Sequence, residues 1–150
     1  LITEPGQEQE AVTRLSRVGF DNTLGYLKGG FDAWKKTARV YDNVSSITAE
    51  NFKQKQEPLV VFDVRKESEY ISEHLEDALN TPLHNIHEHL NQFPENNTFY
   101  LHCAGGYRSM IAASILKNRG IHNIINIKGG FTALKQSSNK ISEFVCPSTL

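Results

Sequence analysis

The chain has 150 residues, of which 39% are hydrophobic and 22% charged, and its formal net charge is -1. That length holds one compact α/β domain with a sizeable core and little more. The near-neutral charge gives no reason to expect nucleic acid or an anionic membrane as a partner. No apolar run is long enough to span a bilayer.

The two cysteines, Cys103 and Cys146, form neither a disulfide framework nor a zinc-binding spacing. This usage is typical of a reducing compartment, so we expect a cytoplasmic protein with thiols and without a metal or a cofactor. The sequence begins without an initiator Met or a secretory signal. We therefore expect it to be a piece of a longer protein.

The first forty residues carry a helical pattern and a glycine turn. Residues 7–18 place Ala11, Val12, Leu15 and Val18 at helical spacing, and Gly19 is a suitable end for the helix. A second short helix is expected after the turn at residues 28–30, with Phe31 and Trp34 as core anchors. The polar, aperiodic residues 37–46 favour a linker or a first strand.

From Thr48, a suitable N-cap, short apolar runs alternate with helical segments. Strands are predicted at residues 59–63, 78–83, 98–103 and 123–127, with helices at 67–74, 84–91 and 109–119. Short continuous apolar runs suit strands that are buried on both faces. The alternation predicts an α/β fold with a parallel sheet covered by helices on both faces.

An internal repeat is the most informative feature of the chain's organisation. Residues 19–35 are GFDNTLGYLKGGFDAWK and residues 120–135 are GIHNIINIKGGFTALK. Both segments have a helix-stopping Gly, an Asn three places later, an apolar stretch, KGGF, an Ala and a closing Lys. We interpret residues 1–40 as the tail of one domain plus a linker, and residues 41–150 as a complete second copy of the same fold.

The stretch HCAGGYRS, residues 102–109, places a cysteine between a predicted strand and a predicted helix that begins near Arg108 or Ser109. The carboxyl ends of parallel strands carry the functional groups of such sheets, and a helix N-terminus favours the thiolate. Gly105 and Gly106 can take positive φ and let successive N–H groups face the sulfur. We predict that Cys103 is a thiolate that carries a negatively charged group.

The number of residues in the loop indicates which group it can hold. Four residues, Ala104, Gly105, Gly106 and Tyr107, separate Cys103 from Arg108. Cysteine-based phosphatases have one residue more in that gap, and their larger loop surrounds a phosphoryl group. The smaller loop suits one additional sulfur atom, which predicts a persulfide on Cys103 held by backbone amides.

These residues resemble the active-site loop of rhodanese-family sulfurtransferases, Cys-x-x-Gly-x-Arg-Ser after a buried strand. DVRKESEY at 63–70 resembles the family's Asp-x-Arg and Glu-aromatic segment, and residues 74–82 resemble its His-to-Pro stretch. There Glu73 and Asp77 replace Gly, and Leu75 replaces Ile. KGGF at 128–131 is similar to the closing Gly-Gly, so the resemblance covers residues 44–137. It implies a three-layer rhodanese-like fold with a mostly parallel five-stranded sheet.

The resemblance also implies roles for individual residues. Cys103 would be the sulfur-accepting nucleophile, and Arg108, paired with Glu69, would stabilise the loop and the anion. The substrate would be held by Ala104, Gly105, Gly106, Tyr107 and Ser109, with Asp63 and Arg65 as supports. The sulfur donor would be thiosulfate or a low-molecular-weight persulfide, and the acceptor a thiol. Thiosulfate-using relatives often have cationic side chains within the loop, so a persulfide is expected to be the better donor.

The first repeat resembles the end of a cysteine-free rhodanese-like domain. Such domains occur in fusions of a metallo-β-lactamase-fold hydrolase with two rhodanese modules. Here the loop position carries Thr-Glu-Pro-Gly and no cysteine. The resemblance implies an upstream lactamase-fold domain, similar to an iron-dependent persulfide dioxygenase, whose metal site lies outside this chain.

Each of these interpretations has a structural alternative. Cys103 can be a buried structural thiol, and the whole module can dock or regulate an attached hydrolase without catalysis. Phosphatase activity is a third hypothesis, which the loop size disfavours. For His84, His87 and His89, a solvated face is favoured over a metal site. For His102, packing is favoured over a role as general base. For Cys146, a thiol without a role in the reaction is favoured over one that resolves the persulfide. Tyr107 suits either a substrate rim or an ordinary exposed position.

Overall fold

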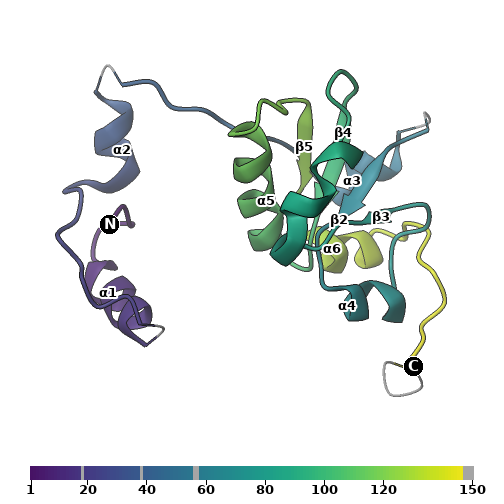
Figure 1. Cartoon of the computed structure of the whole chain (residues 1–150), viewed down its shortest axis with the longest axis horizontal. Coiled ribbons are helices and arrows are strands. Elements are labelled where there is room, and N and C mark those ends of the chain that lie inside the picture. The colour runs from purple at the N-terminus through teal and green to yellow at the C-terminus, as the bar shows by residue number, and fades with distance from the viewer. Residues whose placement is uncertain (18, 38, 56–57, 147–150) are drawn as a thin grey trace. The chain divides into compact units, whose positions relative to one another are not determined.

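A computed structural model of the chain describes residues 1–17, 19–37, 39–55 and 58–146. Val18, the last of the predicted helical positions, lies outside the described residues. The chain divides into two compact units, Leu1–Asn43 and Val44–Leu150. In Figure 1 the colour runs along the chain from purple in the first unit to yellow at the end of the second.

The first unit contains two short helices, α1 (Glu8–Ser16) and α2 (Gly30–Lys35). No residue of α1 is buried, and the unit exposes several large apolar side chains, namely Ile2, Phe20, Leu24, Tyr26 and Phe31. Phe31 is 43% exposed and Trp34 is half-buried, so within this unit neither is the buried core anchor that the sequence predicts. The reason is that the described part of this unit contains no sheet against which α2 packs.

The second unit is built on a five-stranded sheet. Its strands are β1 (Ser45–Ile47), β2 (Val61–Asp63), β3 (Leu79–Asn80), β4 (Phe99–His102) and β5 (Ile124–Ile127), in the order β1-β5-β4-β2-β3. The four pairings between these strands are all parallel, which confirms the predicted parallel sheet. Parallel neighbours need crossover connections, and helices supply them here.

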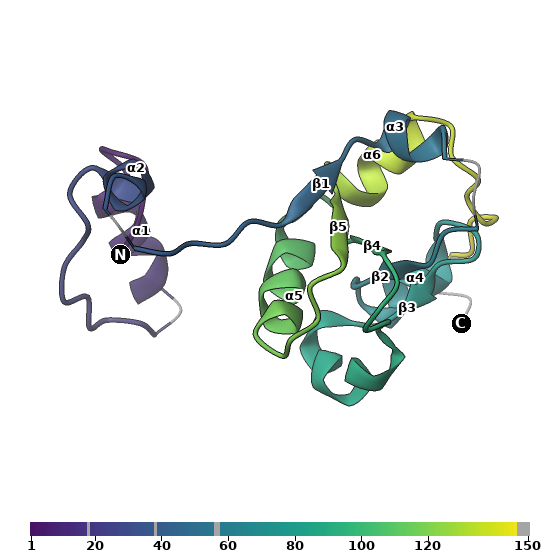
Figure 2. The same cartoon turned by 90° about the horizontal axis from the view of Figure 1, so that it is seen from above.

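Helices cover both faces of that sheet. They are α3 (Ala49–Lys53), α4 (Glu67–Ser72), the 3-10 helix η1 (Leu83–Gln92), α5 (Tyr107–Lys117) and α6 (Gly130–Gln136). In Figure 2, α5 lies on one side of the strands and α3 and α6 on the other. Neighbouring residues of β4 enter opposite cores, since Leu101 packs with Leu116 of α5 and Tyr100 with Leu134 of α6. This arrangement explains why the strand sequence is continuously apolar.

Several predicted boundaries differ from the structure. Thr48 caps α3 as expected and accepts a hydrogen bond from the amide of Asn51 at 3.3 Å. Strand β3 is shorter than residues 78–83 because Pro82 and Leu83 already lead into η1. That segment, predicted as an ordinary helix, is a 3-10 helix with a kink at Asn85. Asp77 adopts a left-handed conformation with φ of 62°, which is the geometry that a glycine normally supplies.

The chain after α6 is attached to the domain by its backbone. Ile141 forms an isolated antiparallel bridge with Leu75, and the amide of Ser142 donates to the carbonyl of His74 at 2.8 Å. The amide of Val145 donates to the carbonyl of Ser72, also at 2.8 Å. The tail therefore runs beside the end of α4. Within the part of the chain that the structure describes, no helix is long and apolar enough to cross a membrane.

Candidate active site

The site lies at the carboxyl ends of β2 and β4, which are adjacent in the sheet. The register pairs Asp63 with His102, so Cys103 leaves the sheet beside the end of β2. Cys103 is 1% exposed, and its side chain belongs to the core on the α5 side. The fold thus places the predicted nucleophile at a strand end and directly before a helix.

The loop after Cys103 turns its backbone towards the sulfur. The amide of Gly106 donates to Cys103 Sγ at 3.1 Å, and Ser109 Oγ lies 3.6 Å from the same sulfur. Gly106 has φ of 108° and is the N-cap of α5, so the helix begins at Tyr107 rather than near Arg108 or Ser109. Gly105 is not in the left-handed region, so only one of the two loop glycines uses positive φ. Ala104 is half-buried, and Tyr107 is 81% exposed at the outside of the loop.

The outer side of the loop is held by the first turn of α6. The amide of Phe131 donates to the carbonyl of Cys103 at 2.7 Å, and the amide of Thr132 donates to the carbonyl of Ala104 at 3.1 Å. Because these two carbonyls bond away from the sulfur, the peptide groups of the loop keep their N–H sides available to it.

Gly130 makes this docking possible. A Cβ atom at this position would lie 2.3 Å from the carbonyl oxygen of Cys103 and 2.7 Å from that of Ala104, and φ is +56°. Such distances exclude any side chain. From the sequence, the glycine pair is recognisable only as a closing motif and this role is not predicted, although the repetition of KGGF in both halves is a signal that points to it.

Arg108 and Glu69 form a bidentate ion pair, as predicted. The guanidinium nitrogens donate to the two carboxylate oxygens at 2.6 and 2.9 Å. The side chains are 31% and 35% exposed. The hydrogen bonds from Arg108 lower the pKa of Glu69, and the carboxylate in turn raises the pKa of Arg108. Both groups are therefore charged at neutral pH, and the cation of the loop has its counter-charge beside it.

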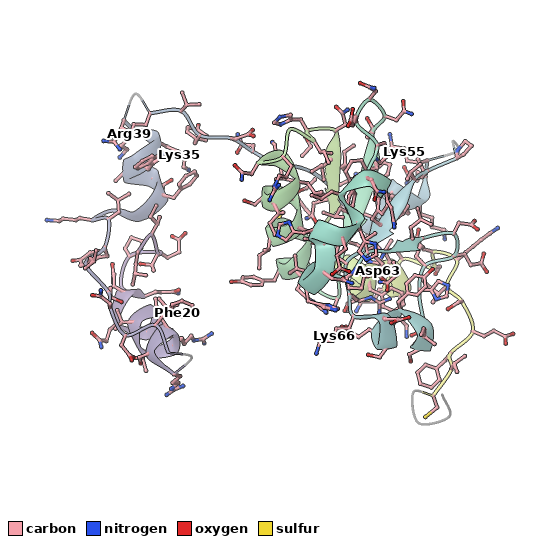
Figure 3. All side chains as sticks on the ribbon, in the orientation of Figure 1. Phe20, Lys35, Arg39, Lys55, Asp63 and Lys66 are labelled. Carbon is pink, nitrogen blue, oxygen red and sulfur yellow. The ribbon has the colours of Figure 1, made fainter. Side chains whose placement is uncertain are left out.

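Asp63 and Arg65 form a buried pair beneath the loop. Arg65 Nε donates to both carboxylate oxygens of Asp63, at 2.8 and 3.0 Å, and a terminal guanidinium nitrogen donates to the carbonyl of Glu73 at 2.8 Å. The guanidinium carbon lies 3.9 Å from the ring centroid of Phe131. Figure 3 labels Asp63 within the domain and Lys66 at its surface. The pair connects the end of β2 with α4 and with the residue whose amide holds Cys103.

His102 points to the opposite face of the sheet from Cys103. Its ring is fully buried, with Nδ1 3.3 Å from the carbonyl oxygen of Cys103 and 3.9 Å from Asp63 Oδ1. Burial lowers the pKa of His102, which favours the neutral ring. Among the described residues its Nε2 atom has no hydrogen-bond partner. These contacts belong to packing beneath the loop, the interpretation that the sequence favoured.

The remaining histidines lie elsewhere. His84 and His87 are exposed on η1, and His89 Nδ1 lies 3.0 Å from Gln92 Nε2. Within the described ranges, no group of three or more His, Cys, Asp or Glu side chains is placed to hold a metal ion. Cys146 is exposed on the tail that passes the end of α4.

A pocket of about 320 Å³ adjoins the ion pair and the loop support. It is lined by Arg65, Ser68, Glu69, Ser72, Glu73 and Phe131. A larger pocket of about 420 Å³ contains Phe52, Val61 and Lys140 but none of the predicted site residues. We consider the smaller pocket the relevant one, because Glu69 binds Arg108 and the Phe131 amide holds Cys103.

The first unit repeats the backbone of this site around Thr3. Gly6 has φ of 87°, where Gly106 has 108°. A Cβ atom on Gly30 would lie 2.4 Å from the carbonyl oxygen of Thr3, as one on Gly130 would from Cys103. Thr3 therefore occupies the position that corresponds to the cysteine, in agreement with the Thr-Glu-Pro-Gly assignment.

Comparisons with known proteins agree with this architecture. A family model described as the rhodanese-like domain matches residues 48–137, more than half of the chain. The "Putative sulfur carrier protein YrkF" of Bacillus subtilis is 34% identical over 91 residues, which cover 59% of this chain and 49% of the relative. A sulfurtransferase of Allochromatium vinosum is 28% identical over 60% of this chain and 87% of its own length.

Solved structures show the same fold. The rhodanese-like domain protein of Staphylococcus aureus is 30% identical and superimposes with a TM-score of 0.59, covering 67% of this chain and all of that one. The three-layer, five-stranded fold expected from the resemblance is thereby confirmed. The chain spans about half the length of the first curated relatives that it matches.

Proposed function

Because the chain belongs to the rhodanese-like domain family, we propose that it is a sulfurtransferase that carries sulfane sulfur as a persulfide on Cys103. The names of the curated relatives, a sulfur carrier and a sulfurtransferase, support a general role in sulfur transfer. One observation carries the assignment to Cys103. Its sulfur accepts a hydrogen bond from the amide of Gly106 at 3.1 Å. The carbonyls of Cys103 and Ala104 accept hydrogen bonds from amides of α6 and so point away from the sulfur.

The proposed reaction is a double displacement in which no oxidant is needed. The Cys103 thiolate attacks the sulfane sulfur of a donor, either thiosulfate or a low-molecular-weight persulfide. A sulfur–sulfur bond forms to Cys103 as the donor's own bond breaks, and sulfite or a thiolate leaves with the electron pair. A thiolate acceptor then attacks the outer sulfur and regenerates the Cys103 thiolate.

The residues around Cys103 have distinct proposed roles. The backbone of Ala104, Gly105, Gly106 and Tyr107 surrounds the outer sulfur, and Ser109 Oγ supplies a hydroxyl near Sγ. Arg108 stabilises the loop and its negative charge. Asp63 and Arg65 act through structure, since they hold the strand end and Phe131 beneath the loop.

Intact-protein mass spectrometry tests this proposal. After incubation with a persulfide donor, the wild-type chain is expected to gain about 32 Da, the mass of one sulfur atom. The gain should disappear in Cys103→Ser and remain in Cys146→Ser, the matched control. A wild-type chain that folds and gains no sulfur contradicts the proposal and favours a docking or regulatory module.

We further propose that the chain is the C-terminal part of a fusion with a metallo-β-lactamase-fold domain, and that it acts in the reducing cytoplasm. In this proposal residues 1–40 complete a preceding rhodanese-like domain and residues 41–150 form the sulfur-carrying one. The contrast between Phe31, 43% exposed, and Phe131, 7% exposed, supports it, because the first unit exposes what the second buries. Expression of the longer reading frame tests the idea: Phe31 should become protected from solvent.

A further inference from the structure

The active-site loop presents almost no uncompensated positive charge. Arg108 is the one ionisable cation between Cys103 and Ser109, and Glu69 binds it through both carboxylate oxygens. The lowered pKa of Glu69 keeps this carboxylate ionised at neutral pH. A compact dianion such as thiosulfate therefore meets backbone amides and a neutralised ion pair rather than a free guanidinium.

The pocket beside the ion pair has a different character. At about 320 Å³ it falls at the lower end of the range for small organic ligands. Helix α4 contributes two hydroxyls and one carboxylate to it, from Ser68, Ser72 and Glu69, and Glu73 directly after the helix contributes a second carboxylate. Phe131 adds an aromatic wall.

Arg65 is the one cation among the residues that line this pocket, and both lining carboxylates are paired with cations from outside the lining. Arg65 binds Asp63, Arg108 binds Glu69, and Lys135 Nζ lies 2.6 Å from Glu73 Oε2. Among the residues that line it, the pocket thus presents hydroxyl and carboxylate oxygens, the latter already in ion pairs, and no unpaired positive charge. An ammonium group with its three N–H donors matches that surface, and a second negative charge does not.

We propose that this pocket binds the organic part of a small persulfide that bears an amino group, and that Glu69 determines the choice of donor. This inference rests on the proposed sulfurtransferase function. Glu69 favours the amino-bearing persulfide by lining the pocket, and it disfavours thiosulfate by neutralising Arg108. Glu69 is a specificity-determining residue in this account, whereas Cys103 carries the reaction.

Glu69→Gln tests the inference because it should change kcat/KM for thiosulfate and kcat/KM for an amino-bearing persulfide in opposite directions. Without the carboxylate charge, Arg108 attracts thiosulfate more strongly, and kcat/KM for thiosulfate should rise about 3- to 10-fold. For cysteine persulfide, kcat/KM should fall by a similar factor through a higher KM. For the persulfide of 3-mercaptopropionate, which lacks the amino group, kcat/KM should fall less than it does for cysteine persulfide.

Glu67→Gln is the matched control, since Glu67 is exposed on the same helix and does not line the pocket. Glu67→Gln should leave the ratio of kcat/KM for thiosulfate to kcat/KM for cysteine persulfide unchanged. A second variant, Ser68→Tyr, reduces the volume of the pocket and leaves both charges of the ion pair in place. It should raise KM for cysteine persulfide more than KM for thiosulfate.

The outcomes separate this inference from the proposed function. Suppose that the wild-type chain takes up sulfur but that Glu69→Gln changes kcat/KM for both donors in the same direction or leaves both values unchanged. In that case the inference is wrong and the proposed function stands. A wild-type chain that accepts sulfur from none of the three donors contradicts the function itself.

Discussion

The loop at Thr3–Glu8 and the loop at Cys103–Arg108 share a backbone plan and differ in their chemistry. Each has a left-handed glycine three residues after its first position, Gly6 and Gly106, followed by a helix. The first loop has Thr where the second has Cys, and Glu8 where the second has Arg108. The two loops thus share their glycine conformations without sharing the nucleophile and the cation that the proposed sulfur chemistry requires.

The two copies also share the glycine pair that receives the loop. Gly29 and Gly30 have φ of 80° and 57°, and Gly129 and Gly130 have 73° and 56°. In both units the second glycine faces the carbonyl oxygen of the first loop residue. The pair therefore serves the geometry of the loop even where no cysteine is present, which makes it a structural requirement rather than a catalytic one.

Arg108→Glu gives the second loop the charge of the first and should have the largest effect. The new carboxylate would replace the ion pair with Glu69 by a like-charge repulsion, and the loop would carry excess negative charge beside the anionic persulfide. We expect the rate of sulfur uptake, measured by mass spectrometry, to fall about 100-fold. Arg108→Lys keeps the charge without the bidentate geometry and should lose less. Uptake at the wild-type rate in Arg108→Glu would show that backbone amides suffice.

Gly130→Ala tests whether the shared glycine pair positions the loop. Its Cβ would collide with the carbonyls of Cys103 and Ala104, so the loop must move. We expect sulfur uptake to fall about tenfold, with kcat affected more than donor KM. Gly120→Ala is the control, because its φ of +87° carries similar backbone strain, about 1–2 kcal/mol, but its Cβ meets no neighbouring atom. Equal uptake in the two variants, after correction for stability, would contradict a positioning role.

His102→Ile introduces the first unit's residue, Ile2, and should have the smallest effect. Burial places the folded-state pKa of His102 below its ordinary value of 6.5, although Asp63 opposes this and Arg65 adds to it. As the pH falls below 6.5 the unfolded chain binds the proton first, so acidification favours unfolding. Between pH 7.5 and 5 the wild-type chain should therefore lose more unfolding free energy than His102→Ile does. Parallel pH profiles from chemical denaturation would show that the ring is accommodated in its charged form.

The sequence predicted the parallel sheet because its signals are local. Apolar runs such as residues 59–63 and 98–103 become strands buried on both faces, and the Cys103 loop follows one of them as expected. The pairing of Arg108 with Glu69 came from the resemblance and was also found. What failed depends on tertiary contacts: the length of β3, the 3-10 character of η1 and the exposure of Phe31 are decided by neighbours that no local pattern contains.

Within the site, the same distinction holds. Cys103, Arg108 and Asp63 are visible as motif residues, whereas the role of Gly130 depends on a carbonyl that is close only after folding. Gly105 and Gly106 look equivalent in sequence, yet only Gly106 takes positive φ because it caps α5. The contact of Arg65 with the Phe131 ring joins segments that are distant in sequence and lay beyond prediction.

The hydrogen bond from the Phe131 amide to the Cys103 carbonyl also determines when the site is completed during biosynthesis. Helix α6 follows every strand of the sheet, so the loop gains its outer support only after that helix has left the ribosome. Until then the nascent chain carries a cysteine without its finished anion cradle. We therefore expect a product truncated before Gly130 to lack this support for the loop, and under the proposed function to carry less sulfur on Cys103 than the complete domain does.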